Sequence, residues 1–212
     1  MIDIAAWLET FSGRLELAFP GRIWFMGLQG SYARGEAKES SDIDIVVIFD
    51  KLTMKDLAEY RAMLDGLPER EKICGFVSGR DELMSWETSD LFQFCRDTIP
   101  IKGSLEEVLA LVDDEAVKRA VKVGACNVYH ACVHNFLHER DPQILKGLYK
   151  AAAFVIQAAY FRSTGHYVRS HRELSALVSP YDRGILAPQN ADFDASSREL
   201  FEWSGRIIHN EA

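Results

Sequence analysis

Two carboxylates lie two residues apart at the start of an apolar run. Asp42 and Asp44 alternate with Ile43 and Ile45, and Val-Val-Ile-Phe follows at residues 46–49. Such β-branched and aromatic residues favour a strand, on which alternate side chains share one face. The two carboxylates would then repel each other, and a bound divalent cation would remove that repulsion. Mg²⁺ often binds one or two carboxylates together with substrate phosphates, so the pattern predicts a magnesium site.

A Gly-Ser pair precedes this strand. The apolar residues 25–28 predict an earlier strand, and Gly30 and Ser31 follow it closely. Glycine lets a ligand approach the main chain, and the backbone N–H groups at a helix start attract phosphate. Arg34, in the expected first helical turn, would add positive charge, although its guanidinium could equally pair with Glu36 or with an aspartate of the strand. The pair therefore predicts a phosphate-binding turn.

An alternative interpretation is a hairpin whose acidic residues lie on its solvated face. The coincidence of turn, spacing and paired carboxylates favours the binding site. The sequence Gly-Ser-Tyr-Ala-Arg-Gly at residues 30–35, with Ser-Asp-Ile-Asp at 41–44, resembles the DNA polymerase beta-type nucleotidyltransferase superfamily. It is similar to the bacterial small-substrate branch, which includes aminoglycoside nucleotidyltransferases and minimal nucleotidyltransferases of toxin–antitoxin pairs. The resemblance implies that Asp42 and Asp44 bind metal, and that the NTP is held by Gly30, Ser31, Arg34 and Ser41.

The resemblance also implies an activity. An enzyme of this kind transfers a nucleoside monophosphate from an NTP to a hydroxyl of a small molecule such as an aminoglycoside. The reaction depends on Mg²⁺, and two magnesium ions are expected in the site. Pyrophosphate is released. Two alternatives stay open, namely a nucleotide-binding regulatory protein that has lost transfer and an enzyme that adds AMP to a partner toxin.

The family usually has a third carboxylate on a later strand, as a general base or a further metal ligand. The strand predicted at residues 73–78 contains no acid, although Glu71 precedes it and Glu82 follows it. Asp97, in an otherwise apolar segment, is the candidate for this catalytic carboxylate. The competing interpretation, that Asp97 ends a helix or caps a turn, is slightly favoured.

Bulk properties restrict the class of protein. The 212 residues carry a formal net charge of −8, which disfavours nonspecific binding to nucleic acid. The start of the sequence lacks the pattern of a secretory signal, and the most apolar run, residues 151–161, is too short to span a bilayer. Four cysteines without a Cys-x-x-Cys pair indicate reduced thiols. We therefore expect a cytoplasmic protein with no membrane or nucleic-acid partner.

The elements that position these residues fall into two groups. An α+β nucleotidyltransferase fold, a small mixed sheet with packed helices, is expected over residues 1–110, and an all-α helical bundle over residues 111–212. Besides the three strands mentioned, the first part should contain helices at 3–17, 53–64 and 91–95 and an edge strand at 99–101. Ser89-Asp90 should cap the helix at 91–95. The second part should contain helices at 113–139, 142–162, 170–177 and 196–209, with a long loop at 179–194.

The helical part offers weaker functional candidates. The resemblance implies that such a bundle helps to close the cleft over the acceptor, so Tyr149, Lys150 and His166 are candidate acceptor contacts; singly, each is better explained as a surface or helix-end residue. Four side chains recur every fourth residue on one helix: Cys126, His130, His134 and His138. A zinc site is one interpretation, but enclosure in a helix buried on several faces is favoured. A homodimer is also left open.

Overall fold

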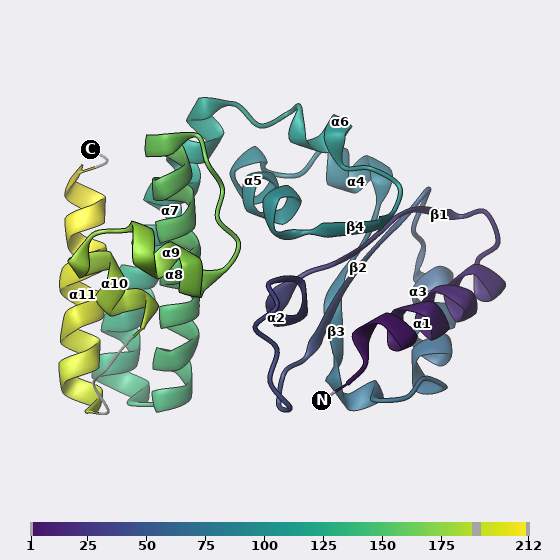
Figure 1. Cartoon of the computed structure of the whole chain (residues 1–212), viewed down its shortest axis with the longest axis horizontal. Helices are drawn as coiled ribbons and strands as arrows, with labels where there is room; N and C mark the ends of the chain where they lie inside the picture. The colour runs from purple at the N-terminus through teal and green to yellow at the C-terminus, as the bar shows by residue number, and fades with distance from the viewer. Residues whose placement is uncertain (1, 188–191, 211–212) are drawn as a thin grey trace. The chain divides into compact units, whose positions relative to one another are not determined.

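The computed structural model describes residues 2–187 and 192–210 (Figure 1). Its contacts define two compact units, one of residues 1–87 and 97–111 and the other of residues 88–96 and 112–212. The sequence predicted a single boundary near residue 110. The structure has a boundary beside residue 111, but residues 88–96 also belong to the helical unit, because Phe92 packs into its core.

A four-stranded mixed sheet forms the centre of the first unit. Its order is β3-β2-β1-β4, in which β1 is antiparallel to both of its neighbours and β2 is parallel to β3. The bounds are β1 Ile23–Leu28, β2 Ile43–Phe49, β3 Ile73–Gly79 and β4 Ile99–Lys102. The small mixed sheet predicted from the sequence is therefore present.

Helices α1 (Ile4–Ala18) and α3 (Met54–Asp65) cover one face of this sheet. The odd-numbered residues of β2, from Ile43 to Phe49, join Phe11 of α1 and Tyr60 of α3 in one buried cluster. Because side chains alternate along a strand, the even-numbered positions, including Asp44, lie on the opposite face. Packing of the apolar face thus fixes the direction in which the acidic residue points.

Short elements complete the first unit. They are α2 Gly30–Ala33, the 3₁₀ turn η1 Arg70–Lys72, α4 Arg80–Met84 and α6 Glu106–Leu109. The sequence analysis did not predict α4. Thr53 caps α3 as predicted, and the capping box is completed by Asp56.

The second unit is helical throughout the part that the structure describes. Its helices are α5 Thr88–Asp97, whose last residue lies in the first unit, α7 Asp114–His134, the π-helical turn η2 Asn135–Glu139, α8 Pro142–Thr164, α9 His171–Leu177, α10 Pro180–Leu186 and α11 Phe193–Asn210. Their buried faces form one core that includes Val121, Ala152, Leu200 and Trp203. No helix among the described residues has the length and hydropathy needed to cross a bilayer.

Three predictions for these helices were wrong in detail. The expected loop at 179–194 contains α10, because Pro180 occupies the first turn of a helix capped by Ser179. Residues 188–191 of that loop lie outside the described part of the chain. Helix α5 begins at Thr88, so Ser89 lies inside it, and α11 begins three residues earlier than predicted.

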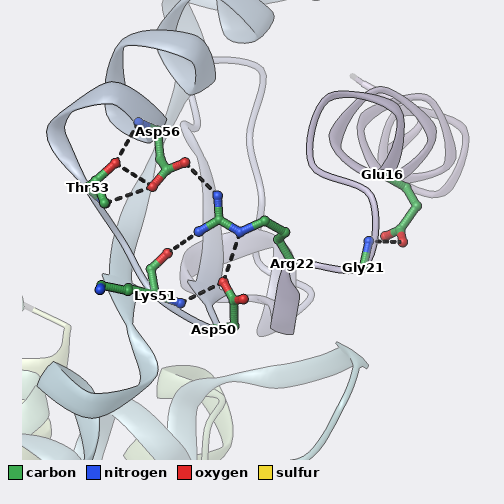
Figure 2. Close-up of polar contacts among 7 residues, drawn as sticks. All are labelled: Glu16, Gly21, Arg22, Asp50, Lys51, Thr53 and Asp56. Carbon is green, nitrogen blue, oxygen red and sulfur yellow. Dashed lines mark hydrogen bonds and ion pairs between the residues drawn. The ribbon is translucent and has the colours of Figure 1, made fainter.

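An arginine joins β1, β2 and α3 at one end of the sheet (Figure 2). Arg22 donates to Asp56 Oδ1 at 2.7 Å, to Asp50 Oδ1 at 3.1 Å and to the carbonyl of Lys51 at 2.6 Å. The other oxygen of Asp56 accepts hydrogen bonds from the N–H and hydroxyl of Thr53. These bonds, that of Arg22 first, lower the pKa of Asp56 from 3.8 to about 2.

Because the folded-state pKa is depressed, the ionised Asp56 stabilises the fold above its unfolded pKa of 3.8, and this contribution disappears as the pH falls toward 2. We expect Asp56→Asn to lower the melting temperature most above about pH 4, with the difference from wild type shrinking toward about pH 2. Asp65→Asn, which breaks an exposed pair with Arg70, is the control and should change little. A difference for Asp56→Asn that is independent of pH would contradict this assignment.

Candidate active site

The end of β1, helix α2 and the start of β2 form one connected structure. The backbone N–H of Gln29, just after β1, donates to the carbonyl of Asp44 at 2.8 Å. Helix α2 then turns the chain away, and the N–H of Glu36 returns to the carbonyl of Ser31 at 2.8 Å. Figure 1 shows α2 beside the end of β2 where the acidic residues begin. The Gly-Ser turn and the carboxylates are therefore neighbours in space.

Gly30 lies directly against the Asp44 carboxylate. Its φ of +68° is in the left-handed region, and a β-carbon at this position would overlap Asp44 Oδ2. Both the backbone conformation and the lack of space thus require glycine here. The close approach holds the Asp44 carboxylate against the turn whose N–H groups are predicted to bind phosphate.

The two aspartates of β2 differ in their exposure. Asp42 is exposed just before the strand, whereas Asp44 is half-buried within it. Their carboxylate oxygens are hard ligands of the kind that Mg²⁺ prefers, so the donor set fits a divalent cation. Among the residues that the structure describes, no three His, Cys, Asp or Glu side chains come close enough to hold a metal ion together. Phosphate oxygens of a nucleotide, or water, would have to complete the coordination.

Two other predicted nucleotide contacts have partners within the protein. Arg34 Nε lies 3.3 Å from Glu36 Oε2, which is one of the two pairings that the sequence left open. Ser41 Oγ accepts from the N–H of Lys38 at 2.8 Å and so closes the turn that leads into Asp42. Both residues lie in the connection between α2 and β2, and their contacts with a nucleotide stay predictions.

Asp97 is buried at the same end of the sheet. It lies two residues before β4, whose residue Ile99 pairs with Leu28 of β1. Because β1 lies between β2 and β4, the strand that carries Asp44 and the strand that follows Asp97 are roughly 10 Å apart. Asp97 is thus the last residue of α5, as one interpretation of the sequence expected. It also lies at the end of the sheet where the site is, so its predicted role as a catalytic carboxylate stays a prediction.

The bond that holds β4 beside the site was not predicted from the sequence. Gln29 Nε2 donates to Thr98 Oγ1 at 2.7 Å, and Thr98 is almost fully buried. The bond fixes the start of β4, and with it Asp97, against the end of β1. The two residues are 69 positions apart, and no local pattern relates them.

The acceptor candidates lie in the helical unit and are described within it. Tyr149 is buried, and its hydroxyl donates to the carbonyl of Ser196 at 2.9 Å and contacts Glu199. Burial raises the pKa of this phenol. These contacts favour a structural role for Tyr149, whereas Lys150 and His166 are exposed. Contact of any of the three with an acceptor stays a prediction.

The histidine stripe is not enclosed by the bundle, so the favoured explanation for it was wrong. Cys126, His130, His134 and His138 are all exposed, because the buried side of α7 is formed by smaller apolar residues such as Val121, Ala125 and Val128. The rings of His134 and His138 lie 4.9 Å apart at the start of η2.

The family model of the nucleotidyltransferase domain matches residues 14–123, which include the turn, both aspartates and Asp97. The chain belongs to this nucleotidyltransferase family. The resemblance drawn from residues 30–47 is therefore confirmed at the level of the family.

Relatives of this nucleotidyltransferase match shorter segments. Two candidate protein adenylyltransferases of Methanocaldococcus jannaschii are 48% identical over 50 residues and 34% identical over 73 residues. These segments are 24% and 31% of this chain and 47% and 73% of the relatives. The protein adenylyltransferase MntA of Thermococcus cleftensis is 50% identical over 46 residues, 20% of this chain and 46% of that protein. The chain thus spans about half the length of two of these relatives.

A solved structure extends the similarity of fold to almost the whole chain. The spectinomycin adenyltransferase AAD(9) from Enterococcus faecialis, crystallised with ATP and spectinomycin, superposes with a TM-score of 0.60 over 97% of this chain and 99% of that one. The sequence identity is 12%, so this similarity concerns the fold. It includes the C-terminal helices as well as the sheet.

The contact between Gly30 and Asp44 can be tested with two alanine substitutions. Gly30→Ala and Gly35→Ala both place a β-carbon at a φ near +70°, but only the first meets Asp44, since nothing lies within 4 Å of the second. We expect Gly35→Ala to lose about 1–2 kcal/mol from backbone strain and to retain ATP binding. Gly30→Ala should lose more stability and bind ATP at least tenfold more weakly. Thermal unfolding and ATP titration would measure both; equal ATP affinity in the two variants would refute the assignment.

Proposed function

We propose that this nucleotidyltransferase moves a nucleoside monophosphate, with AMP as the first choice, from an NTP to a hydroxyl of an acceptor. The direct contact of Gly30 with the Asp44 carboxylate is the observation that supports this most strongly. It joins a phosphate-binding turn to a cation ligand in one small site. In-line attack of the acceptor oxygen on the α-phosphate would release pyrophosphate.

The residues of the site would act mainly by positioning and by charge. The turn at Gly30 and Ser31 would hold the triphosphate, and Asp42 and Asp44 would hold two divalent cations, with Mg²⁺ the first choice, against it. A bound cation neutralises negative charge on the phosphates. Asp97, buried beside β1, would accept the proton of the attacking hydroxyl.

A small molecule is our first candidate for the acceptor. The similarity to the spectinomycin enzyme covers almost all of both chains and includes the helical unit. A fold retained over that length supports an acceptor of similar size. The net charge of −8 is compatible with a cationic acceptor such as an aminoglycoside.

A protein hydroxyl is the second candidate. It is supported by local sequence identities of 48% and 50% to proteins that are named as protein adenylyltransferases. The transferred group and the site would be the same, and only the acceptor would differ. A third outcome, nucleotide binding without transfer, would make the protein a regulatory module.

These candidates are separated by incubating the purified protein with α-labelled ATP and MgCl₂. One series receives a panel of aminoglycosides and spectinomycin, and the other receives the proteins encoded beside its gene. Label on a small molecule or on a protein identifies the acceptor class. ATP binding without product in either series would favour the regulatory module, and absence of NTP binding would overturn the proposal.

Asp44→Asn tests the predicted cation ligand, because it removes the charge with little change in shape. Loss of a preorganised charge-stabilising group typically costs about 10²–10³ in turnover. We expect a decrease of that size in Mg²⁺-dependent product formation, with circular dichroism unchanged. Asp50→Asn at the far end of β2 is the matched control and should retain activity. Equal activity of the two variants would remove Asp44 from the mechanism.

Asp97→Asn tests the predicted base. General bases typically contribute about 10²–10⁴ to the rate, so we expect a loss in kcat within that range and ATP affinity within about twofold of wild type. Asp90→Asn, on an exposed position of α5, is the control. Unchanged kcat for Asp97→Asn would restrict this residue to a structural role at the end of α5.

A further inference from the structure

The face of α7 that points away from the core carries a row of mainly apolar side chains, here called the α7 seam. Its residues follow a spacing of three and four: Val123, Cys126, His130, Val133 and Leu137. Val123 is 49% exposed and Leu137 is 63% exposed, while the opposite side of α7 is buried in the core of the unit. Alternation of three and four is the pattern by which helices pack against a partner helix.

The neighbouring helix α11 extends this face. A groove of about 450 Å³ runs between α7 with η2 and α11, and its lining includes Val133, Phe136, Leu137 and Phe201. Phe201 is 40% exposed, although its ring also lies 4.8 Å from the ring of Tyr129. Exposed apolar side chains on two adjacent helices thus make one continuous surface.

Charges alternate along α11, and three of the four residues, Asp194, Arg198 and Glu202, line this groove. Asp194, Arg198, Glu202 and Arg206 follow one another at intervals of four residues, and all four are exposed. Asp194 also pairs with Arg140 at 2.5 Å, and the guanidinium of Arg206 lies over Tyr181. Among the described residues, no ion pair within the protomer involves Arg198 or Glu202.

The register between α7 and α11 is fixed by contacts along their length. Lys122 Nζ donates to the carbonyl of Ile208 at 2.6 Å, and Cys132 Sγ lies 3.3 Å from the carbonyl of Ser197. The rings of Phe136 and Phe193 are stacked. The helices are therefore antiparallel, and the level of residue 130 on α7 coincides with that of residue 200 on α11.

We propose that this face, formed by the α7 seam and the α11 charges, binds a second copy of the chain about a two-fold axis at that level. An axis perpendicular to both helices would place each helix antiparallel to its own copy. On α11, Arg198 would then face Glu202 of the second copy, and Asp194 would face Arg206 of the second copy. The row of alternating charges on α11 therefore meets opposite charges when it packs against an antiparallel copy of itself.

The same axis also fits the seam on α7. About residue 130, Val123 is matched with Leu137 of the second copy, Cys126 lies within one residue of the level of Val133 of the second copy, and His130 meets its own equivalent. Apolar side chains would thus face apolar side chains, as in an isologous interface. Two patterns, one of charge and one of hydrophobicity, are compatible with the same axis. This coincidence favours a second copy over an unrelated protein.

Charge reversal tests the proposed dimer in the full-length protein. The wild type should elute at twice the protomer mass of 24.0 kDa in light-scattering chromatography. Arg198→Glu and Glu202→Arg each place like charges together in a homodimer, and each should weaken dimerisation at least tenfold. An equimolar mixture of the two variants restores both pairs in a heterodimer and should return to the dimer mass. Lys146→Glu, on an exposed position of α8, is the control.

A cross-link tests the position of the axis. In a Cys74→Ser/Cys126→Ser background, His130→Cys should form a disulfide-linked dimer on mild oxidation, whereas Lys146→Cys should not. A monomeric wild type at all concentrations would overturn the proposal, as would a dimer that survives both charge reversals. Failure of the mixed variants to associate, with circular dichroism unchanged, would exclude the two-fold pairing of Arg198 with Glu202.

Discussion

The close approach of Gly30 to the Asp44 carboxylate is the constraint around which the first unit is arranged. It requires β1 to end, and the chain to turn, directly beside the acidic start of β2. The hydrogen bond from Gln29 to the Asp44 carbonyl fixes that relation on the main chain. On the other side of β1, the side chain of Gln29 fixes Thr98. One short segment thus positions three strands, and with them both Asp44 and Asp97.

The apolar face of the sheet is the second requirement for this site. Ile43 and Ile45 are completely or almost completely buried under α1 and α3, so a shift of β2 by one residue would move them to the wrong face. That cost in burial keeps Asp42 and Asp44 on the side away from these helices. At the far end of the sheet, Arg22 joins the strands to α3 by ionic and main-chain bonds (Figure 2). Hydrophobic burial therefore sets the register, and the polar network closes the end opposite the site.

The local parts of this arrangement could be predicted from the sequence. The strand carrying Asp42 and Asp44, the Gly-Ser turn and the cap at Thr53 each follow from side-chain type over a few residues. The contact of Gln29 with Thr98 could not be predicted, because it joins segments that only the completed sheet brings together. Helix α10 was not predicted because proline disfavours the interior of a helix, although Pro180 suits the first turn of one. The membership of α5 in the helical unit depends on tertiary packing of Phe92 and is likewise absent from local patterns.

The histidine stripe shows how one spacing can support different conclusions. Residues four apart on α7 suggested a metal site or a buried helix, because each of these brings such side chains together. The exposure of Val123 and Leu137 adds a second spacing, of three and four, in which Cys126 and His130 are members of an apolar seam. A seam of this kind costs solvation free energy when it faces water, and burial against another helix would recover it. The alternating charges of α11 select an antiparallel copy as the partner, since a parallel copy in register would place like charges together.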